Sequence, residues 1–384
     1  MTGEATTPLP CQRAQFDLPP DVVYLNAAFM GPRLRAVGEA GAAALARTSE
    51  PWTLEAADWF AGPERLRAAV ARLLGADAED VALVPAVSYG IAIAAANLPL
   101  VRDQRIVVLD EQFPSNVYAW RDKARASGAE LRTVRKEPHD AWTDAVVEAI
   151  DEDTAIVAVP NGHWTDGALV ELERVGERAR AVGAALVVDA SQSFGAYPLD
   201  VAAVRPDFLV SVGYKWQLGP YGLGYLYVDP KRRNGRPLEA SWAARAGAED
   251  FAGLVRYADA YRAGARRFDM GEFAQFQLGP MALAALTQIE AWGVARIQAA
   301  LGALTARVAE GAAALGCDVL AAERRLDHLV GLRFPGGIPR ELPRRLAAER
   351  IYVSVRGDAI RVAPHVHNHT DDAERLLAVL RATM

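Results

Sequence analysis

Lys215 is the residue best placed for covalent chemistry, and it is one of only four lysines in a chain of 384 residues. It follows the apolar run Phe208–Val212 and lies among glycine and aromatic residues, whereas the other three lysines have polar neighbours. Apolar surroundings disfavour the ammonium form and lower the pKa of the amine, which a lysine that forms a Schiff base requires. The alternative is a lysine whose stem packs on aromatic rings while its charged end reaches water.

Asp189 is a second candidate, because it ends another apolar run, Leu186–Val188. Burying a carboxylate without a partner is costly, so this position calls for a cation or a strong donor. The protonated ring nitrogen of pyridoxal 5′-phosphate (PLP) is such a donor, and PLP withdraws electrons best when a carboxylate holds that proton. Together with Lys215, Asp189 predicts a PLP site. An aspartate that only caps the following turn is the alternative.

Other polar and aromatic residues also follow apolar runs. In an open α/β sheet, ligands bind at the carboxyl ends of the strands, so these residues are candidate contacts. Ser88 is expected to cap the start of a helix, where its hydroxyl and the free backbone amides around Ser88 and Tyr89 could bind a phosphate. Phe113 could stack on a pyridine ring. Alternatively, Ser88 caps the helix without binding a ligand, and Phe113 is an ordinary residue of the hydrophobic core. Further candidates are Asn161, His163, Ser211 and Tyr214.

The elements that must position these residues alternate along the chain. Short runs rich in Val, Ile and Leu, which predict strands, alternate with helical patterns such as Val170–Val182. This alternation predicts an α/β fold with a mainly parallel sheet. Residues 213–222 are too few for a helical crossover to the next run, Leu223–Val228, so that connection should join antiparallel strands. The earlier runs are Val81–Val84, Arg105–Leu109, Ala155–Val159, Ala184–Val188 and Phe208–Val212.

A change of pattern predicts a second domain, since a chain of this length exceeds what one hydrophobic core usually supports. Met281–Leu315 is rich in alanine and predicts long helices. Beyond it, Leu329–Phe334 and Ile351–Val355 are expected to be strands that flank a helix at Glu341–Glu349. We expect a large α/β domain over residues 21–260 and a smaller α+β domain made of residues 1–20 and 261–384.

Composition disfavours several other classes of function. The formal net charge of −6 is spread without long runs of either sign, so neither nucleic acid nor a membrane is expected as a partner. Residues 1–20 lack the pattern of a secretory signal, and we expect a cytoplasmic location. Only Cys11 and Cys317 are present, too few for a disulfide framework. The glycine motif of dinucleotide sites and the serine elbow of α/β hydrolases are not found where those folds need them.

Three alternating histidines near the end of the chain, His365, His367 and His369, could suggest a metal site, since imidazole binds several transition metals. The nearby carboxylates, Asp371 and Asp372, have a polar setting typical of solvated side chains. We therefore expect a surface loop and no metal.

Taken together, these residues resemble the class V aminotransferase family of fold-type I PLP enzymes, which includes cysteine desulfurases, kynureninases and isopenicillin N epimerases. The resemblance runs from Tyr24–Ala28 to Ile360–Pro364. Its most specific parts are Val188–Gln192 and Ser211–Lys215, whose aspartate and lysine stand 26 residues apart. It implies a seven-stranded, mainly parallel sheet with a smaller α+β domain, PLP as cofactor, an amino acid as substrate and a homodimer.

The resemblance also implies roles for single residues. Lys215 would form the Schiff base, Asp189 would hold the pyridine nitrogen, and Gln192 would lie near the phenolic oxygen of PLP. The phosphate would be held by Ser88, Ser211 and Tyr214. The segment Glu111–Asn116 is similar to the kynureninase form of the ring-stacking segment, in which a phenylalanine replaces the histidine of desulfurases.

On the substrate side, Arg361 would clamp the carboxylate with its planar guanidinium, and Asn26 and Trp164 are further candidates. Three positions depart from the family pattern. His163–Gly167 lacks an asparagine that many members have, Glu272 stands where a threonine is usual, and the approach to Arg361 lacks the cysteine-bearing loop of desulfurases.

The reaction stays open at this stage, because the cofactor breaks the bond and the protein selects which one. Transamination or side-chain cleavage of an L-amino acid is the leading hypothesis, and Phe113 favours the latter. Epimerisation is the alternative. A non-catalytic binding module with a PLP-enzyme fold is disfavoured by the intact Lys215, Asp189 and Arg361.

Overall fold

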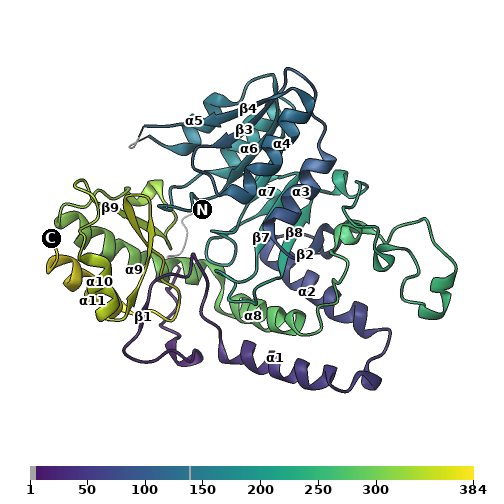
Figure 1. The fold of residues 1–384 in the computed structure, drawn as a ribbon, viewed down its shortest axis with the longest axis horizontal. Helices are drawn as coiled ribbons and strands as arrows, with labels where there is room; N and C mark the ends of the chain where they lie inside the picture. Colours follow the sequence, from purple (N-terminus) through teal and green to yellow (C-terminus); the bar gives the residue numbers. More distant parts are fainter. Residues whose placement is uncertain (1–5, 138–139) are drawn as a thin grey trace.

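The computed structural model describes residues 6–137 and 140–384, so residues 1–5 of the smaller predicted domain lie outside the described residues. A seven-stranded sheet with the order β2-β8-β7-β6-β5-β3-β4 forms the larger part of the molecule (Figure 1). Only β8 runs antiparallel to its neighbours, β7 and β2. The strands are β2 (Val81–Val84), β3 (Arg105–Leu109), β4 (Glu130–Val134), β5 (Thr154–Pro160), β6 (Ala185–Asp189), β7 (Phe208–Val212) and β8 (Gly224–Val228).

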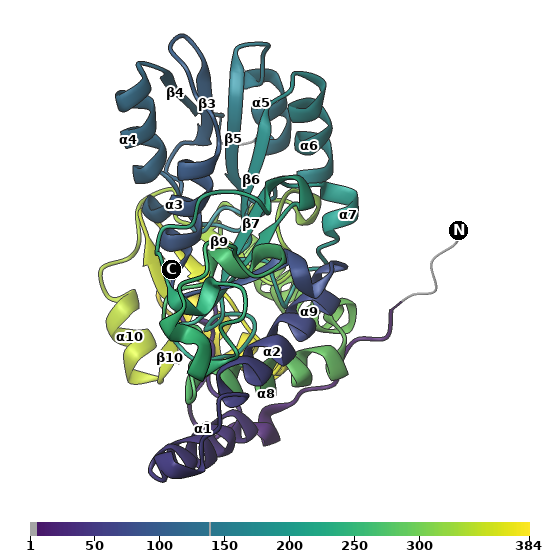
Figure 2. The ribbon, with the colours of Figure 1, turned by 90° about the vertical axis from the view of Figure 1, so that its right-hand side faces the viewer.

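Helices cover both faces of this sheet, as Figure 2 shows for α4 and α6 on opposite sides. Alternate residues of one strand pack into different hydrophobic clusters, as Val107 and Val108 of β3 do, because successive side chains of a strand point to opposite faces. The α/β class, the mainly parallel sheet and the antiparallel β7–β8 pair are therefore confirmed. The helices around the sheet are α2 (Asp58–Leu74), α3 (Val87–Asn97), α4 (Tyr118–Ser127), α5 (Trp142–Ala149), α6 (Leu172–Ala181) and α7 (Val201–Val204).

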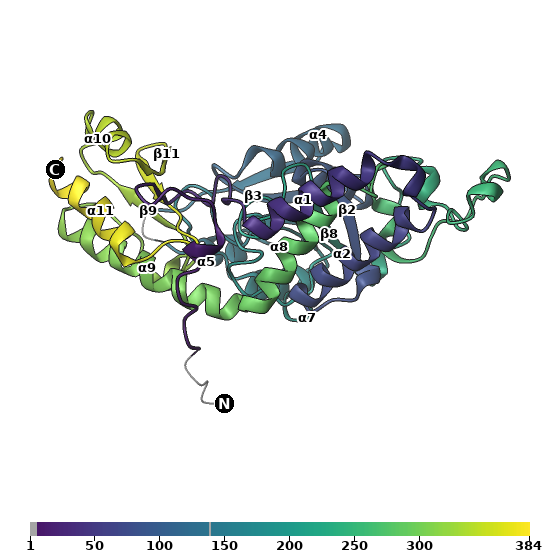
Figure 3. The ribbon, with the colours of Figure 1, turned by 90° about the horizontal axis from the view of Figure 1, so that it is seen from below.

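A three-stranded antiparallel sheet, in the order β11-β12-β9, forms the smaller part. Two consecutive helices, α8 and α9, run from the larger part to this sheet, as Figure 3 shows; they occupy the predicted alanine-rich stretch. The helix α1 (Arg35–Thr48) packs along α8. The elements of this part are α8 (Leu278–Trp292), α9 (Val294–Ala314), β9 (Val330–Arg333), α10 (Leu342–Ala348), β11 (Ser354–Arg356), β12 (Ala359–Val362) and α11 (Thr370–Arg381).

The strand expected over Ile351–Val355 is divided in two. Its first part, β10 (Ile351–Tyr352), pairs in parallel with β1 (Val23–Tyr24), whereas β11 pairs with β12. An early segment of the chain thus lies against the C-terminal part, and the boundary between the two expected domains stays a prediction. Across residues 6–137 and 140–384, none of the helices combines the length and apolarity needed to cross a bilayer.

Candidate active site

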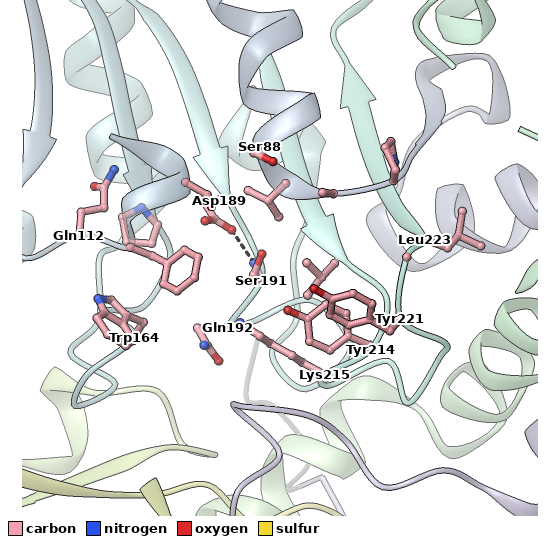
Figure 4. A pocket seen from close by; sticks show the side chains of 18 of the residues that line it. Ser88, Gln112, Trp164, Asp189, Ser191, Gln192, Tyr214, Lys215, Tyr221 and Leu223 are labelled. Carbon is pink, nitrogen blue, oxygen red and sulfur yellow. Dashed lines mark hydrogen bonds between the residues drawn. The ribbon is translucent and has the colours of Figure 1, made fainter. Parts of the chain in front are cut away.

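A cavity of about 320 Å³ opens at the carboxyl ends of β5, β6 and β7. Its size lies at the lower end of the range for small-molecule sites, roughly 300 to 1,000 Å³. Figure 4 shows Asp189 and Lys215 on opposite sides of this space, with Trp164 at one end and Tyr214 and Tyr221 at the other. The structure brings these sequence-predicted residues to its walls: Ser88, Phe113, Trp164, Asp189, Gln192, Tyr214 and Lys215.

Lys215 lies in the turn after β7, and its side chain is buried. Its Nζ lies 5.6 Å from the centre of the Phe113 ring and 5.9 Å from that of Tyr214. Burial lowers the pKa of this amine from 10.5 to about 8, although the Asp189 carboxylate acts in the opposite direction. No carboxylate of the described residues lies within the 4.0 Å of an ion pair. The site thus holds an amine that loses its proton at a lower pH than an exposed lysine does.

The lysine turn lies against the N-terminal segment at Gly31, where only a residue without a side chain fits. The Gly31 amide donates a hydrogen bond to the Tyr214 carbonyl over 2.9 Å, and a Cβ on Gly31 would collide with the Lys215 carbonyl oxygen. Only glycine lets the backbones meet here. The position of Lys215 therefore depends on the N-terminal segment as well as on β7.

Asp189 is the last residue of β6, and 7% of it is exposed. One carboxylate oxygen accepts a hydrogen bond from the Ser191 amide over 3.0 Å. Burial raises the pKa of this carboxyl, and the contacts with Ser191 and the charge of Lys215 oppose that effect. Within the described part of the chain it forms no ion pair, so a protonated ring nitrogen would supply the cation that the site lacks.

Gln192 lines the same cavity, and its amide group is held from two sides. Its Oε1 accepts from Trp216 Nε1 over 3.0 Å, and its Nε2 donates to the Ala28 carbonyl over 3.2 Å. His328, which the sequence analysis missed, donates from Nε2 to the Gln192 carbonyl over 2.6 Å. Burial lowers the pKa of His328 to about 3, so this ring is neutral. No local pattern marks His328, because it lies 136 residues from its partner.

Four of the predicted cofactor contacts do not lie as expected, namely Ser88, Tyr89, Ser211 and His163. Ser88 lies in the first turn of α3, which begins at Val87 after the N-cap Ala86, so Ser88 is not the cap. It nevertheless lines the cavity at that helix start. The Tyr89 hydroxyl turns away and donates to Glu239 over 2.7 Å.

Ser211 points away from the cavity because of the pleat of β7. Its hydroxyl is buried, donates to the Val212 carbonyl over 3.1 Å and accepts from Gln217 Nε2 over 3.0 Å. Val212, the next residue, lines the cavity instead. Successive residues of a strand face opposite sides, so the two cannot both reach the cavity.

His163 faces an adjoining cavity and not the one around Lys215. Its Nε2 lies 3.2 Å from the Asp110 carbonyl and its Nδ1 lies 2.7 Å from the Thr165 hydroxyl, so both ring nitrogens have partners within the chain. Asn161 is also turned inward, since its amide donates to the Val170 carbonyl over 3.0 Å. Neither the His163 nor the Asn161 side chain lines the cavity around Lys215.

The expected histidine surface loop is wrong for two of its three histidines, because His365 and His367 are fully buried. Their Nε2 atoms contact the backbone carbonyls of Trp216 and Tyr24 over 3.0 and 2.9 Å. Burial lowers their pKa values to about 4 and about 3. These neutral rings tie the C-terminal segment to the lysine turn and to β1, and only His369 is partly exposed.

The predicted substrate-side residues lie together beside the smaller sheet, whose central strand, β12, carries Arg361. Arg361 is almost fully buried, and its Nη1 donates to the Trp164 carbonyl over 2.6 Å. Its Nε and Nη2 have no hydrogen-bond partner among the described residues, and burial lowers its pKa to about 9. Asn26 accepts a hydrogen bond from Ser354 over 2.7 Å on the neighbouring strand. Arg361 does not itself line the cavity, but Trp164 does.

Comparison with known proteins agrees with this geometry. The profile of the family "Aminotransferase class-V" matches residues 53–384. The chain belongs to the class V aminotransferase family. The enzymes of this family depend on PLP and act on amino acids, so the predicted cofactor and enzyme class are confirmed at the level of the family.

Relatives within the class V aminotransferases differ in their reactions. The chain is 26% identical over 327 residues to an uncharacterised aminotransferase, YcbU, of Bacillus subtilis, and the match covers 81% of each chain. It is 31% identical over 287 residues to a kynureninase of Deinococcus radiodurans, covering 70% of this chain and 66% of that one. An apo cysteine desulfurase from Thermococcus onnurineus has the same fold, with a TM-score of 0.86 over 98% of both chains at 21% identity.

Proposed function

We propose that this class V aminotransferase catalyses transamination or side-chain cleavage of an L-amino acid, with Lys215 as the covalent attachment point of PLP. The observation that carries the proposal is a buried amine and a buried carboxylate, Lys215 and Asp189, in one cavity and without ion-pair partners among the described residues. Both groups are costly to bury, and a group with an aldehyde and a basic ring nitrogen would satisfy both.

Other residues that line the cavity suit the pyridine ring and the phosphate of PLP. The Phe113 ring could cover one face of the pyridine ring, as the resemblance to kynureninase implies. The start of α3 carries no side-chain cap and lies at the cavity, so its free amides and Ser88 suit a phosphate. Tyr214 adds a hydroxyl from the lysine turn. Ser211 is left out of this set because its hydroxyl is bonded elsewhere.

PLP, when bound, supplies an electron sink that weakens the bonds at the α-carbon of an amino acid. The chain has to orient the substrate and to move protons. Arg361 would hold the α-carboxylate with its Nε and Nη2 donors, which have no partner in the part of the chain that the structure describes. The Lys215 amine, with a pKa near 8, would take and return the proton at the substrate α-carbon.

We also propose that the enzyme is a cytoplasmic homodimer. Three large apolar residues far from the core are strongly exposed, namely Trp52, Val255 and Tyr257. Tyr221, at the rim of the cavity, is 68% exposed. A second copy of the chain would cover such a surface and exclude water from the cavity. Both cysteines are free thiols, which suits a reducing compartment.

The attachment point is tested by borohydride reduction of the purified protein followed by peptide mapping. We expect a yellow protein in which reduction fixes PLP irreversibly on Lys215, and Lys215→Ala should lose activity by orders of magnitude while retaining its fold. The proposal fails if full activity survives in Lys215→Ala. It also fails if the label falls on one of the other lysines, Lys123, Lys136 or Lys231.

A further inference from the structure

A second arginine lies on the same face of the smaller sheet as Arg361. In the β11–β12 hairpin, Ser354 pairs with Arg361 and Arg356 pairs with Ala359. Paired residues of an antiparallel hairpin share a face, and so do residues two apart on one strand. Arg356 and Arg361 are therefore diagonal neighbours, a relation that brings long side chains within reach of each other.

Both guanidinium groups contact the same wall of the cavity. The Cζ atom of Arg356 lies 5.3 Å from the centre of the Trp164 ring, and Arg361 donates to the carbonyl of that tryptophan. Trp164 lines the cavity, where its ring meets Phe113 edge-on with the ring centres 5.4 Å apart. The two charges also lower the pKa of Lys215, as expected for cations near the amine.

Neither arginine has a counter-ion in the described part of the chain. Arg356 donates from Nη1 only to the carbonyl of its neighbour Val355, and its buried Nε has no partner. Arg333, opposite Ala359 on the next strand, is by contrast paired with Asp358 over 2.6 Å. The almost fully buried Arg361 is costly without an anion, and the partly exposed Arg356 adds a second positive charge beside it that an anion would offset.

One guanidinium suffices for the α-carboxylate, so the second requires another anion. We propose that Arg356 recognises an acidic group on the side chain of the substrate, which would make the substrate an amino acid with a side-chain carboxylate. The Trp164 ring covers one face of the guanidinium and Nη1 donates to the Val355 carbonyl, so the Nε–Nη2 edge remains for two parallel hydrogen bonds. This inference rests on the proposed function, in which Arg361 holds the α-carboxylate.

The test compares wild type with Arg356→Gln, which removes the charge and retains an amide donor. L-aspartate and L-glutamate are assayed against their amides, L-asparagine and L-glutamine, through kcat/KM. We expect wild type to prefer the acids and Arg356→Gln to lose on the order of 10- to 100-fold on the acids alone, the scale of a hydrogen bond to a charged group. Arg333→Gln is the matched control, and it should leave the preference unchanged.

A binding measurement on the holoenzyme gives a readout without turnover. Succinate and glutarate are compared with their monoamides by calorimetry, and only the diacids should bind more weakly to Arg356→Gln. Equal losses on acids and amides, no acid preference in wild type, or a changed oligomeric state with unchanged ligand preference would each overturn the role of Arg356. Failure of the proposed function would appear differently, as absence of bound PLP or of its reducible link to Lys215.

Discussion

The buried amine of Lys215 should make the cofactor-free protein less stable than a variant with an apolar side chain at that position. The fall of its pKa from 10.5 to about 8 corresponds to about 3 kcal/mol against the charged form in the folded state. Lys215→Met keeps a long, flexible side chain and removes the charge. We therefore expect the apoprotein of Lys215→Met to gain about 2 to 4 kcal/mol in the free energy of unfolding at pH 7.

The pH dependence of this gain identifies its cause. Below pH 8 the amine is charged in both the folded and the unfolded state, so wild type bears the full cost of burying it. Between pH 8 and 10.5 the unfolded chain binds more protons than the folded one, so the stability of wild type rises with pH. Above pH 10.5 the amine is neutral in both states. The advantage of Lys215→Met should shrink across this interval.

Urea unfolding of both apoproteins at pH 7 and pH 10, followed by tryptophan fluorescence, measures this difference. Lys231→Met is the control, because the Lys231 ammonium is exposed and lies 3.2 Å from the Asp207 carboxylate. That variant should show no stabilisation at pH 7. An advantage of Lys215→Met that is the same at both pH values would refute the electrostatic reasoning and assign the gain to apolar packing. A less stable Lys215→Met at pH 7 would refute it outright.

Three further predictions concern the site. Arg361→Lys should weaken amino-acid binding by about 1.5 to 3 kcal/mol, because an ammonium group cannot reproduce the two-pronged contact; unchanged affinity with unchanged PLP content would make Arg361 structural. Replacing Cys11 and Cys317 by alanine should leave turnover intact, since neither lines the cavity, and loss of sulfide or persulfide release in that variant would contradict this. Asp189→Asn should still bind PLP and should lower kcat on the order of 10²-fold, the scale of a lost electrostatic contact. A kcat of this variant equal to that of wild type would exclude a role of Asp189 at the ring nitrogen.

Much of the architecture can be predicted from local patterns in the sequence. Apolar runs of four to six residues, separated by helical patterns, predict a parallel sheet because such strands are buried on both faces. Asp189 and Lys215 could be assigned to one site because the carboxyl ends of parallel strands meet at the same edge of a sheet. The short connection after β7 also predicted its antiparallel partner, since a crossover needs more residues.

The orientation of single side chains was decided only by the tertiary structure. A strand end is visible in the sequence, but the side of the sheet that faces the cavity is not, so Ser211 is turned away from the cavity and Val212 lines it instead. His365 and His367 are in a polar stretch, yet they are buried because that segment packs against residues more than 140 positions away.

Arg356 shows the same dependence on tertiary structure. The sequence by itself placed an aspartate and a lysine, Asp189 and Lys215, at the ends of predicted strands, and the family resemblance added Arg361. The register of the β11–β12 hairpin places Arg356 beside Arg361, and the packing of Trp164, far from both in the chain, sets the two arginines against a wall of the cavity. Contacts between segments distant in the chain, such as that of Trp164 with Arg361 across 197 positions, leave no local pattern in the sequence, so only the tertiary structure decides them.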